Sequence, residues 1–182
     1  MKKSTFNLAA IFVFAVVPAF GAEEEAGPKT GIKLAEGQVV MTAPKTWVSK
    51  TPKFKGIVDY EFTVPAAKEG ENPGRVTIGG AGGGVQANFS RWKGQFAQSS
   101  ALEQKLEVAG QTVHVLDLKG TYKGSRFRNE PSQENSRMLA AIIVTEKVGS
   151  YYVKFYGSRK LVAANEGLFR GVINSLKVAA KK

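Results

Sequence analysis

Residues 76–96, VTIGGAGGGVQANFSRWKGQF, change from one type of secondary structure to another within a few positions. The stretch begins as an apolar strand and then holds five glycines within residues 79–84. After the glycines, apolar side chains recur at spacings of four, three and four, at Val85, Phe89, Trp92 and Phe96. This spacing is typical of the buried face of a helix. The stretch therefore predicts a strand, a glycine-rich bend and a helix in succession.

Extended segments on either side of this unit predict the fold class. Residues 56–64, GIVDYEFTV, alternate polar and apolar side chains with the period of two that a half-buried strand shows. Residues 105–122 and 137–157 each predict a hairpin with a glycine-containing turn. Residues 159–178 return to helical spacing. We therefore expect an α+β fold, an antiparallel sheet with two main helices packed on it as a sandwich.

The N-terminal residues predict export. Two lysines precede an apolar run over residues 8–20, and small residues and three glutamates follow it. This pattern is typical of a secretory signal peptide and is too short to span a bilayer as a helix, so we expect cleavage after Gly21 or Ala22. No later segment is long enough to span a membrane, and the mature protein is expected in the periplasm or outside the cell. The expected organisation is a signal peptide over residues 1–21, a flexible tether over 22–36, a single α+β domain over 37–178 and a basic tail over 179–182.

The mature chain is strongly basic. The full sequence of 182 residues holds 26 basic and 15 acidic residues, a net charge of +11, of which +9 remains when Lys2 and Lys3 leave with the signal peptide. A basic surface attracts anionic partners, so we expect an anionic envelope component or another exported protein as partner. Nucleic acid is not expected, because the protein is exported. The alternative that the charge only maintains solubility stays open, since the lysines are scattered along the chain.

The residue types limit the chemistry that the chain can perform. Cysteine is absent and His114 is the only histidine, which excludes cysteine nucleophiles and zinc sites built on thiolates or several histidines. Asp117 lies three positions from His114 in a predicted strand, so their side chains point to opposite faces. We expect no catalytic residue, no metal and no cofactor, and a binding or accessory protein that is not an enzyme. A periplasmic enzyme acting on an anionic substrate is the alternative.

The glycine run has two interpretations. A dinucleotide fingerprint needs a glycine where Val85 or Ala87 stands, and a P-loop needs Lys followed by Ser or Thr where Val85 and Gln86 stand. A nucleotide site is therefore not expected. A glycine-rich loop before a helix can still hold a smaller anion through backbone N–H groups. The alternative is a bend that lets the chain turn and pass close to a neighbouring element. The candidate anion site consists of Gly79, Gly80, Gly82, Gly83, Gly84 and Arg91.

The order of motifs resembles that of a family of uncharacterised small exported bacterial proteins. That family has an early P-x-x-W, a strand ending in a glycine-rich turn, N-x-x-R-W-x-x-Q-F, a G-x-Y strand end, a strand like RMLAAIIV and a terminal helix. Here these are Pro44 with Trp47, residues 79–84, Asn88 with Arg91, Trp92, Gln95 and Phe96, Gly120 with Tyr122, and residues 137–144. In layout the family is similar to the PsbP-like fold of the photosystem II extrinsic subunit. The resemblance implies an antiparallel sheet with helices on its faces, and a binding or accessory role.

Overall fold

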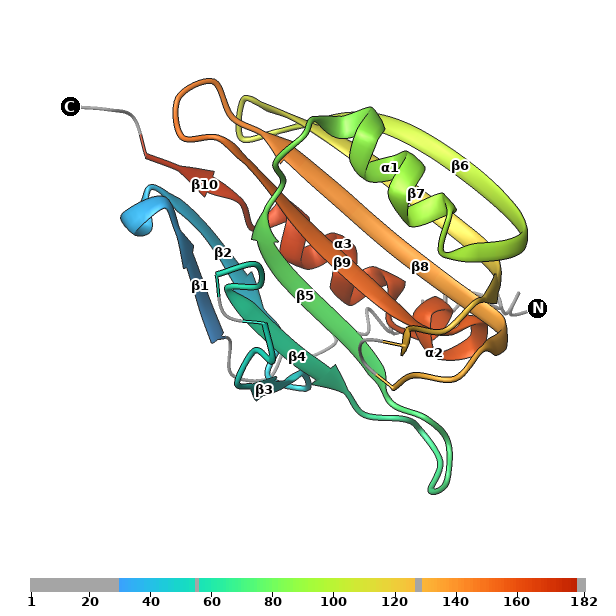
Figure 1. Cartoon of the computed structure of the whole chain (residues 1–182). Helices are drawn as coiled ribbons and strands as arrows, with labels where there is room; N and C mark the ends of the chain where they lie inside the picture. Colours follow the sequence, from blue (N-terminus) through green and yellow to red (C-terminus); the bar gives the residue numbers. More distant parts are fainter. Residues whose placement is uncertain (1–29, 55, 127–128, 180–182) are drawn as a thin grey trace, which may run out of the picture.

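The computed structural model describes residues 30–54, 56–126 and 129–179, which form an α+β fold (Figure 1). The expected signal peptide lies outside the described residues. In chain order the elements are β1 (Thr30–Leu34), η1 (Ala35–Gly37), β2 (Val39–Ala43), β3 (Val48–Lys50), β4 (Tyr60–Val64), β5 (Gly74–Gly80), α1 (Val85–Lys93), β6 (Phe96–Val108), β7 (Gln111–Tyr122), β8 (Gln133–Val144), β9 (Ser150–Ser158), α2 (Arg159–Ala164), α3 (Glu166–Asn174) and β10 (Lys177–Val178). Within these ranges, no helix combines the length and the apolar character that crossing a membrane requires.

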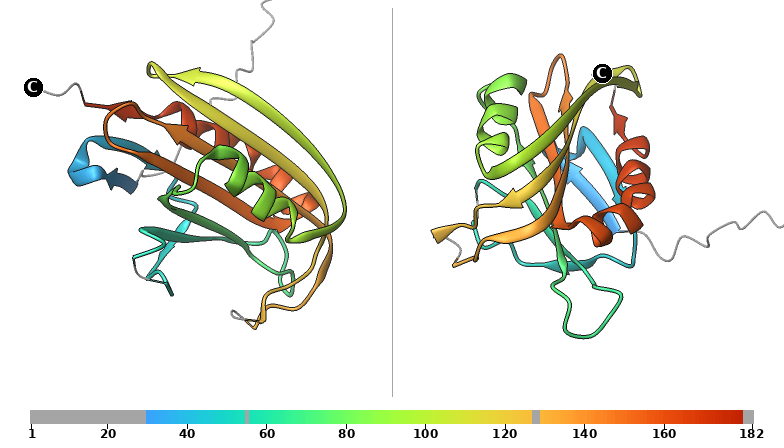
Figure 2. Two further views of the ribbon diagram at one scale, coloured as in Figure 1. Left: turned by 45° about the horizontal axis from the view of Figure 1, so that its top comes forward. Right: turned by 90° about the vertical axis from the view of Figure 1, so that its right-hand side faces the viewer.

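A seven-stranded antiparallel sheet, in the order β3-β4-β5-β9-β8-β7-β6, forms the middle layer. Successive side chains of a strand point to opposite faces, and the central strands are apolar on both. In β8, Leu139, Ala141 and Ile143 belong to one buried cluster, while Met138 and Ala140 belong to another. The sheet is therefore covered on both faces, and Figure 2 shows the three layers that result.

One face of the sheet is covered by α2, α3 and a second sheet of order β1-β2-β10 (Figure 1). This second sheet corrects the predicted tether, since residues 30–36 are part of the folded domain. β1 pairs with β2 along its whole length and buries Ile32 and Leu34 in the core. Two apolar residues in a five-residue strand are too few for sequence periodicity to reveal it. Residues 22–29 lie outside the described residues.

Helix α1 covers the opposite face of the sheet (Figure 2). Phe89 and Trp92 of the predicted stripe are buried there, with ring centroids 5.9 Å apart. Phe96, the last member of the stripe, belongs to the same core but is the first residue of β6. The prediction of a helix after the glycines is therefore confirmed over Val85–Lys93.

Two consecutive helices, α2 and α3, stand where a single closing helix is predicted, so the described residues form three α-helices. The break is at Asn165, whose φ of −111° and ψ of 10° leave the helical region. Its side-chain amide donates to the Leu161 carbonyl over 2.9 Å. Asparagine favours such local hydrogen bonds over a continuing helix. The expectation of two main helices is therefore wrong in number, although α2 and α3 cover the same face.

A buried ion cluster joins α3 to the sheet. Arg137 of β8, with its side chain 7% exposed, donates to Asp117 of β7 over 2.8 and 2.9 Å and to Glu166 of α3 over 2.7 Å. Burial raises the pKa of Asp117, but hydrogen bonds from Arg137 and Lys119 lower it by more, so this pKa lies below its ordinary value of 3.8. Hydrogen bonds from Arg170 and Arg137 also hold the pKa of Glu166 below its ordinary value of 4.5. Both carboxylates are therefore ionised at neutral pH.

Candidate anion-binding site

The second half of the glycine run forms the bend between β5 and α1. Gly83 and Gly84 have φ values of 82° and 77°, in the region that favours glycine, and Gly84 is the N-cap of α1. The buried side chain of Asn88 holds this bend, because its amide donates to the carbonyls of Gly82 (2.9 Å) and Gly84 (2.7 Å). The carbonyls of the bend are thus fixed by the first turns of the helix.

Gly79 allows the loop between β3 and β4 to approach the sheet. A Cβ at this position would lie 2.6 Å from the carbonyl oxygen of Ile57 and 3.3 Å from the Tyr152 side chain. The same carbonyl accepts a hydrogen bond from the Tyr152 hydroxyl over 3.3 Å. The missing side chain therefore lets Ile57 and Tyr152 meet above β5.

We expect Gly79→Ala to lower the free energy of unfolding by about 1–3 kcal/mol, the usual cost of overpacking. The backbone of Ile57 would have to move to admit the methyl group. Gly80→Ala is the matched control, because nothing lies within 4 Å of a Cβ at that position. A change within about 0.5 kcal/mol is expected for the control. Chemical denaturation measures both, and equal losses would contradict the role assigned to Gly79.

An open cavity of about 440 Å³ lies where β5 and β9 meet α1 and the β3–β4 loop. Its volume is in the range of small-ligand sites. Strand register brings its residues together, since Thr77 of β5 lies directly opposite Lys154 of β9. Charged, hydroxyl, amide and apolar side chains share the wall. The lining residues are Phe54, Ile57, Val58, Arg75, Thr77, Gly80, Gly82, Arg91, Trp92, Gln95, Tyr152 and Lys154.

The first cation of the cavity, Arg75, is held by a carboxylate. Its guanidinium donates to both oxygens of Glu61 on β4, over 2.8 and 3.1 Å. Burial raises the pKa of Glu61, but the hydrogen bonds and charge of Arg75 lower it by more, so the pKa lies below its ordinary value of 4.5. Glu61 is therefore ionised at neutral pH, and it both orients Arg75 and offsets part of its charge.

The other two cations contact neutral groups. Arg91, exposed on α1, donates to the side-chain oxygen of Asn88. The Lys154 ammonium lies 5.8 Å from the centroid of the Trp92 ring, within the range of a cation–π interaction. The contact with Asn88 does not offset the positive charge of Arg91, which therefore adds to the positive potential of the cavity.

Two hydroxyl groups complete the polar wall. Burial is the main cause that raises the pKa of Tyr152 above its ordinary value of 10.0, although a hydrogen bond with Thr77 and the charge of Arg75 act in the opposite direction. The Tyr152 hydroxyl is therefore protonated at neutral pH, and it donates its proton to the Ile57 carbonyl. Thr77, 3% exposed, supplies a second hydroxyl beside it.

Positive charge exceeds negative charge around this cavity. Among the described residues that line it, three side chains are cationic and none is a carboxylate, although Glu61 bonds Arg75 and the charge of Asp59 acts on Tyr152. Guanidinium and ammonium groups only donate hydrogen bonds, and hydroxyls and amides can donate as well. Phosphate, sulfate and carboxylate oxygens accept such bonds. The arrangement therefore suits an oxyanion.

The structure brings part of the predicted anion site to this cavity. Gly80, Gly82 and Arg91 line it. Gly79 lies behind the wall, beneath the β3–β4 loop. Residues 83–84 form the turn and do not line the cavity. The six predicted residues thus divide between the cavity and the bend.

Three residues of the cavity, Arg75, Tyr152 and Lys154, were not predicted from the sequence. Part of the signal was present, because Tyr152 and Lys154 are two positions apart in a strand and so share a face. Arg75 and Thr77 share a face for the same reason. The sequence does not show that β5 and β9 are neighbours, and that pairing is what unites the two sets.

His114 lies away from this group. It stands opposite Lys105 of β6 and Ile142 of β8, and it does not line the cavity. Asp117 points to the other face of β7, where it bonds Arg137. Throughout the described part of the chain, no three His, Cys, Asp or Glu residues gather as they would around a metal ion.

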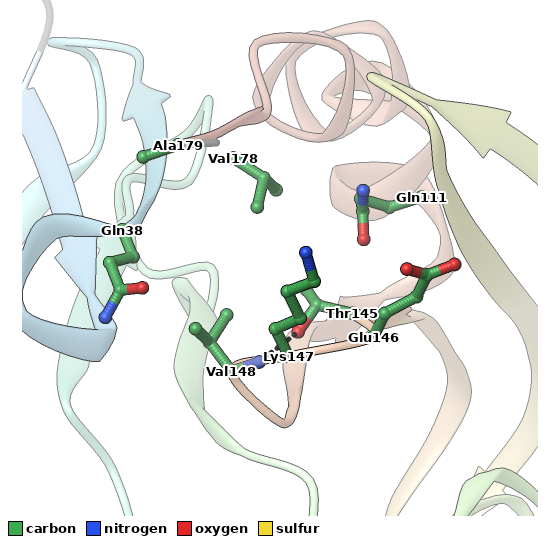
Figure 3. Close-up of a pocket in the computed structure, with 8 residues that line it drawn as sticks. All are labelled: Gln38, Gln111, Thr145, Glu146, Lys147, Val148, Val178 and Ala179. Carbon is green, nitrogen blue, oxygen red and sulfur yellow. Dashed lines mark hydrogen bonds between the residues drawn. The ribbon is translucent and has the colours of Figure 1, made fainter. Parts of the chain in front are cut away.

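A second cavity, of about 270 Å³, opens between η1, β10 and the turn that joins β8 to β9. Figure 3 shows Lys147 of this turn pointing into it, with Glu146 beside Lys147 and Gln111 above. One cation beside one carboxylate gives no excess of charge. The cavity beside α1 is therefore the stronger candidate for an anionic ligand.

The chain is similar to known proteins in its fold and not in its sequence. No family model and no curated protein matches the chain. Among solved structures, the cyanobacterial PsbP (CyanoP) of Synechocystis sp. PCC 6803 matches with a TM-score of 0.54 and 14% identity, over 87% of this chain and 96% of that one. LpqN of Mycobacterium tuberculosis matches with a TM-score of 0.51 and 9% identity, over 84% and 91%. At such low identity the matches concern the fold alone. The chain has a PsbP-like fold.

Proposed function

We propose that the protein is an exported, non-enzymatic binding or accessory protein that holds an anionic component of the cell envelope in the cavity beside α1. The observation that carries the proposal is the convergence of Arg75, Arg91 and Lys154, from three different elements, on one open cavity. Their charge and donor groups favour an anion over a cation or a neutral ligand. The enzyme alternative would require an acid or base placed at the reacting atoms.

The rim of the cavity favours an anion that also carries an apolar group. Ile57 is 69% exposed there, the most of the three exposed large apolar side chains among the described residues, and Phe54 also lines the cavity. An exposed aliphatic side chain next to cations can pack against the apolar part of a ligand. We therefore expect phenyl phosphate to bind more tightly than inorganic phosphate.

Export is part of the proposal and rests on the N-terminal sequence. LpqN, which shares the fold, is described as involved in cell envelope biogenesis, so the fold occurs in a protein of that setting. We expect the intact mass of the protein recovered from the periplasm or medium to lack residues 1–21 or 1–22. A full-length chain found only in the membrane fraction would contradict export.

The binding proposal is tested by calorimetric titration of the mature protein with phosphate and phenyl phosphate. We expect Arg91→Gln and Lys154→Gln each to weaken binding by about tenfold or more, since a hydrogen bond to a charged group contributes about 1.5–3 kcal/mol. Lys160→Gln is the matched control, because it removes an exposed positive charge on α2, across the sheet from the cavity. This control should bind like the wild type.

Two outcomes would contradict the proposal. Equal weakening by all three substitutions would mean that net charge, and not the cavity, attracts the anion. Slow release of phosphate from bound phenyl phosphate, abolished by a substitution in the cavity, would favour the enzyme instead. Circular dichroism confirms that each variant is folded before it is titrated.

A further inference from the structure

Strand β6 forms one edge of the large sheet and pairs only with β7 among the described strands (Figures 1 and 2). The strand is 13 residues long, and residues 98–105 are all exposed. Leu102, a large apolar residue, is 56% exposed on this edge. The other edge strand, β3, is only three residues long. Proteins usually shorten or cover a sheet edge, because its free backbone groups can pair with another strand.

The sequence of this edge is complementary to itself. Residues 102–106 read Leu-Glu-Gln-Lys-Leu. In an antiparallel pair centred on Gln104, each leucine would therefore lie opposite a leucine, and the glutamate opposite the lysine. Gln104 is at the centre of this segment. It is also the midpoint of residues 100–108, which pair with β7 without a register shift. The regular part of the edge and the complementary pattern therefore share one centre.

We propose that two copies of the protein pair antiparallel through β6, with Gln104 opposite Gln104 of the second copy. Glu103 then lies opposite Lys105 of the second copy, and Leu102 opposite Leu106, and each pair occurs twice. Opposite charges directly across two strands stabilise their pairing, as do apolar pairs. The two large sheets would continue as one across a two-fold axis, which is the commonest symmetry of soluble dimers.

The faces of β6 agree with this register. Leu106 packs against the core on the α3 side, and Leu102, four positions away, shares that face. Glu103 and Lys105 share the α1 side, where Glu103 pairs with Lys93 in an exposed contact. Paired residues in an antiparallel sheet point to the same face. Each proposed pair satisfies this requirement.

A single-cysteine experiment tests the register, since the chain has no cysteine of its own. Opposed Cα atoms in an antiparallel sheet are about 4.5–5.5 Å apart, within the roughly 4.4–6.8 Å that a disulfide spans. Gln104→Cys should therefore oxidise rapidly to a covalent dimer. In Ser100→Cys, the control on the same exposed strand, the two thiols would be separated by eight positions, on the order of 26 Å. Equal oxidation of both variants would overturn the register.

Sedimentation equilibrium of the wild type tests the dimer itself, at concentrations up to about 1 mM to include weak complexes. Lys105→Glu would place two pairs of glutamates opposite each other, and we expect it to weaken dimerisation at least tenfold. Glu103→Lys combined with Lys105→Glu restores opposite charges and should restore the dimer. A wild type that stays monomeric, or a double variant as weak as the single one, would overturn the proposal.

Discussion

In the Trp92→Ala variant we expect the free energy of unfolding to fall by about 3–5 kcal/mol, the usual cost of truncating a buried large aromatic residue. Trp92 is 3% exposed, and its ring centroid lies 5.9 Å from that of Phe89 and 6.0 Å from that of Tyr152. Chemical denaturation measures the loss. A loss below about 1 kcal/mol would contradict the packing described for α1.

Trp92 also forms part of the cavity wall, so its replacement should weaken anion binding. Lys154 and Tyr152 both contact the ring and would lose their support. Trp47→Ala is the matched control: Trp47 is 2% exposed in the core on the other face, 6.0 Å from the rings of Phe62 and Phe155. It should lower stability by a similar amount but leave phosphate affinity unchanged in the folded protein. Equal affinities of the two variants for phosphate would mean that Trp92 does not support the site.

The second large effect is expected for Arg137→Ala, with a loss of about 3 kcal/mol. Breaking a buried ion pair usually costs about 3–5 kcal/mol, because the remaining charge stays buried without its partner. The expected loss is at the lower end of this range, because the Lys119 ammonium, 3.2 Å from Asp117, would still pair with that carboxylate. Arg170→Ala is the control: Arg170 bonds the same Glu166 but is 45% exposed, and about 0.5 kcal/mol or less is expected. Similar losses for the two variants, measured by denaturation, would contradict the account of this cluster.

The same cluster predicts how stability depends on pH. The pKa values of Asp117 and Glu166 lie below their ordinary values of 3.8 and 4.5, so the unfolded chain takes up protons at a higher pH than the folded protein does. The stabilisation is therefore complete above those ordinary values and is lost as the pH falls through the lower pKa values of the folded state. We expect Arg137→Ala to lose less stability than the wild type on acidification from pH 6 to about pH 3. Equal losses would mean that Arg137 does not set these pKa values.

The parts of the fold that the sequence predicted are those with a regular pattern. The alternation in residues 56–64 and the helical stripe after the glycines both correspond to real elements, β4 and α1. The hairpin turns were also readable, because Gly110 and Gly149 have φ values of 70° and 87° that few other residues adopt. Regular patterns arise where one face of an element is buried and the other is not.

The parts that the sequence did not predict lack such a pattern. Residues 98–105 of β6 are exposed on both faces, so their side chains do not alternate. β1 is too short to show a period, and a single residue, Asn165, divides the closing helix. The site was only partly predicted for a different reason: Arg75 and Lys154 meet through the pairing of β5 with β9, which depends on the topology of the sheet.

The central claim, that the cavity beside α1 binds an oxyanion, is tested most directly by NMR titration of the mature protein with phosphate. We predict saturable shifts of the amide signals of Thr77, Gly80, Gly82 and Lys154, which weaken as competing salt is added. Arg91→Gln should reduce these shifts. Diffuse shifts that do not saturate and that spread over all the lysine-bearing segments would contradict the claim, because they would show that phosphate responds to net charge and to no particular site.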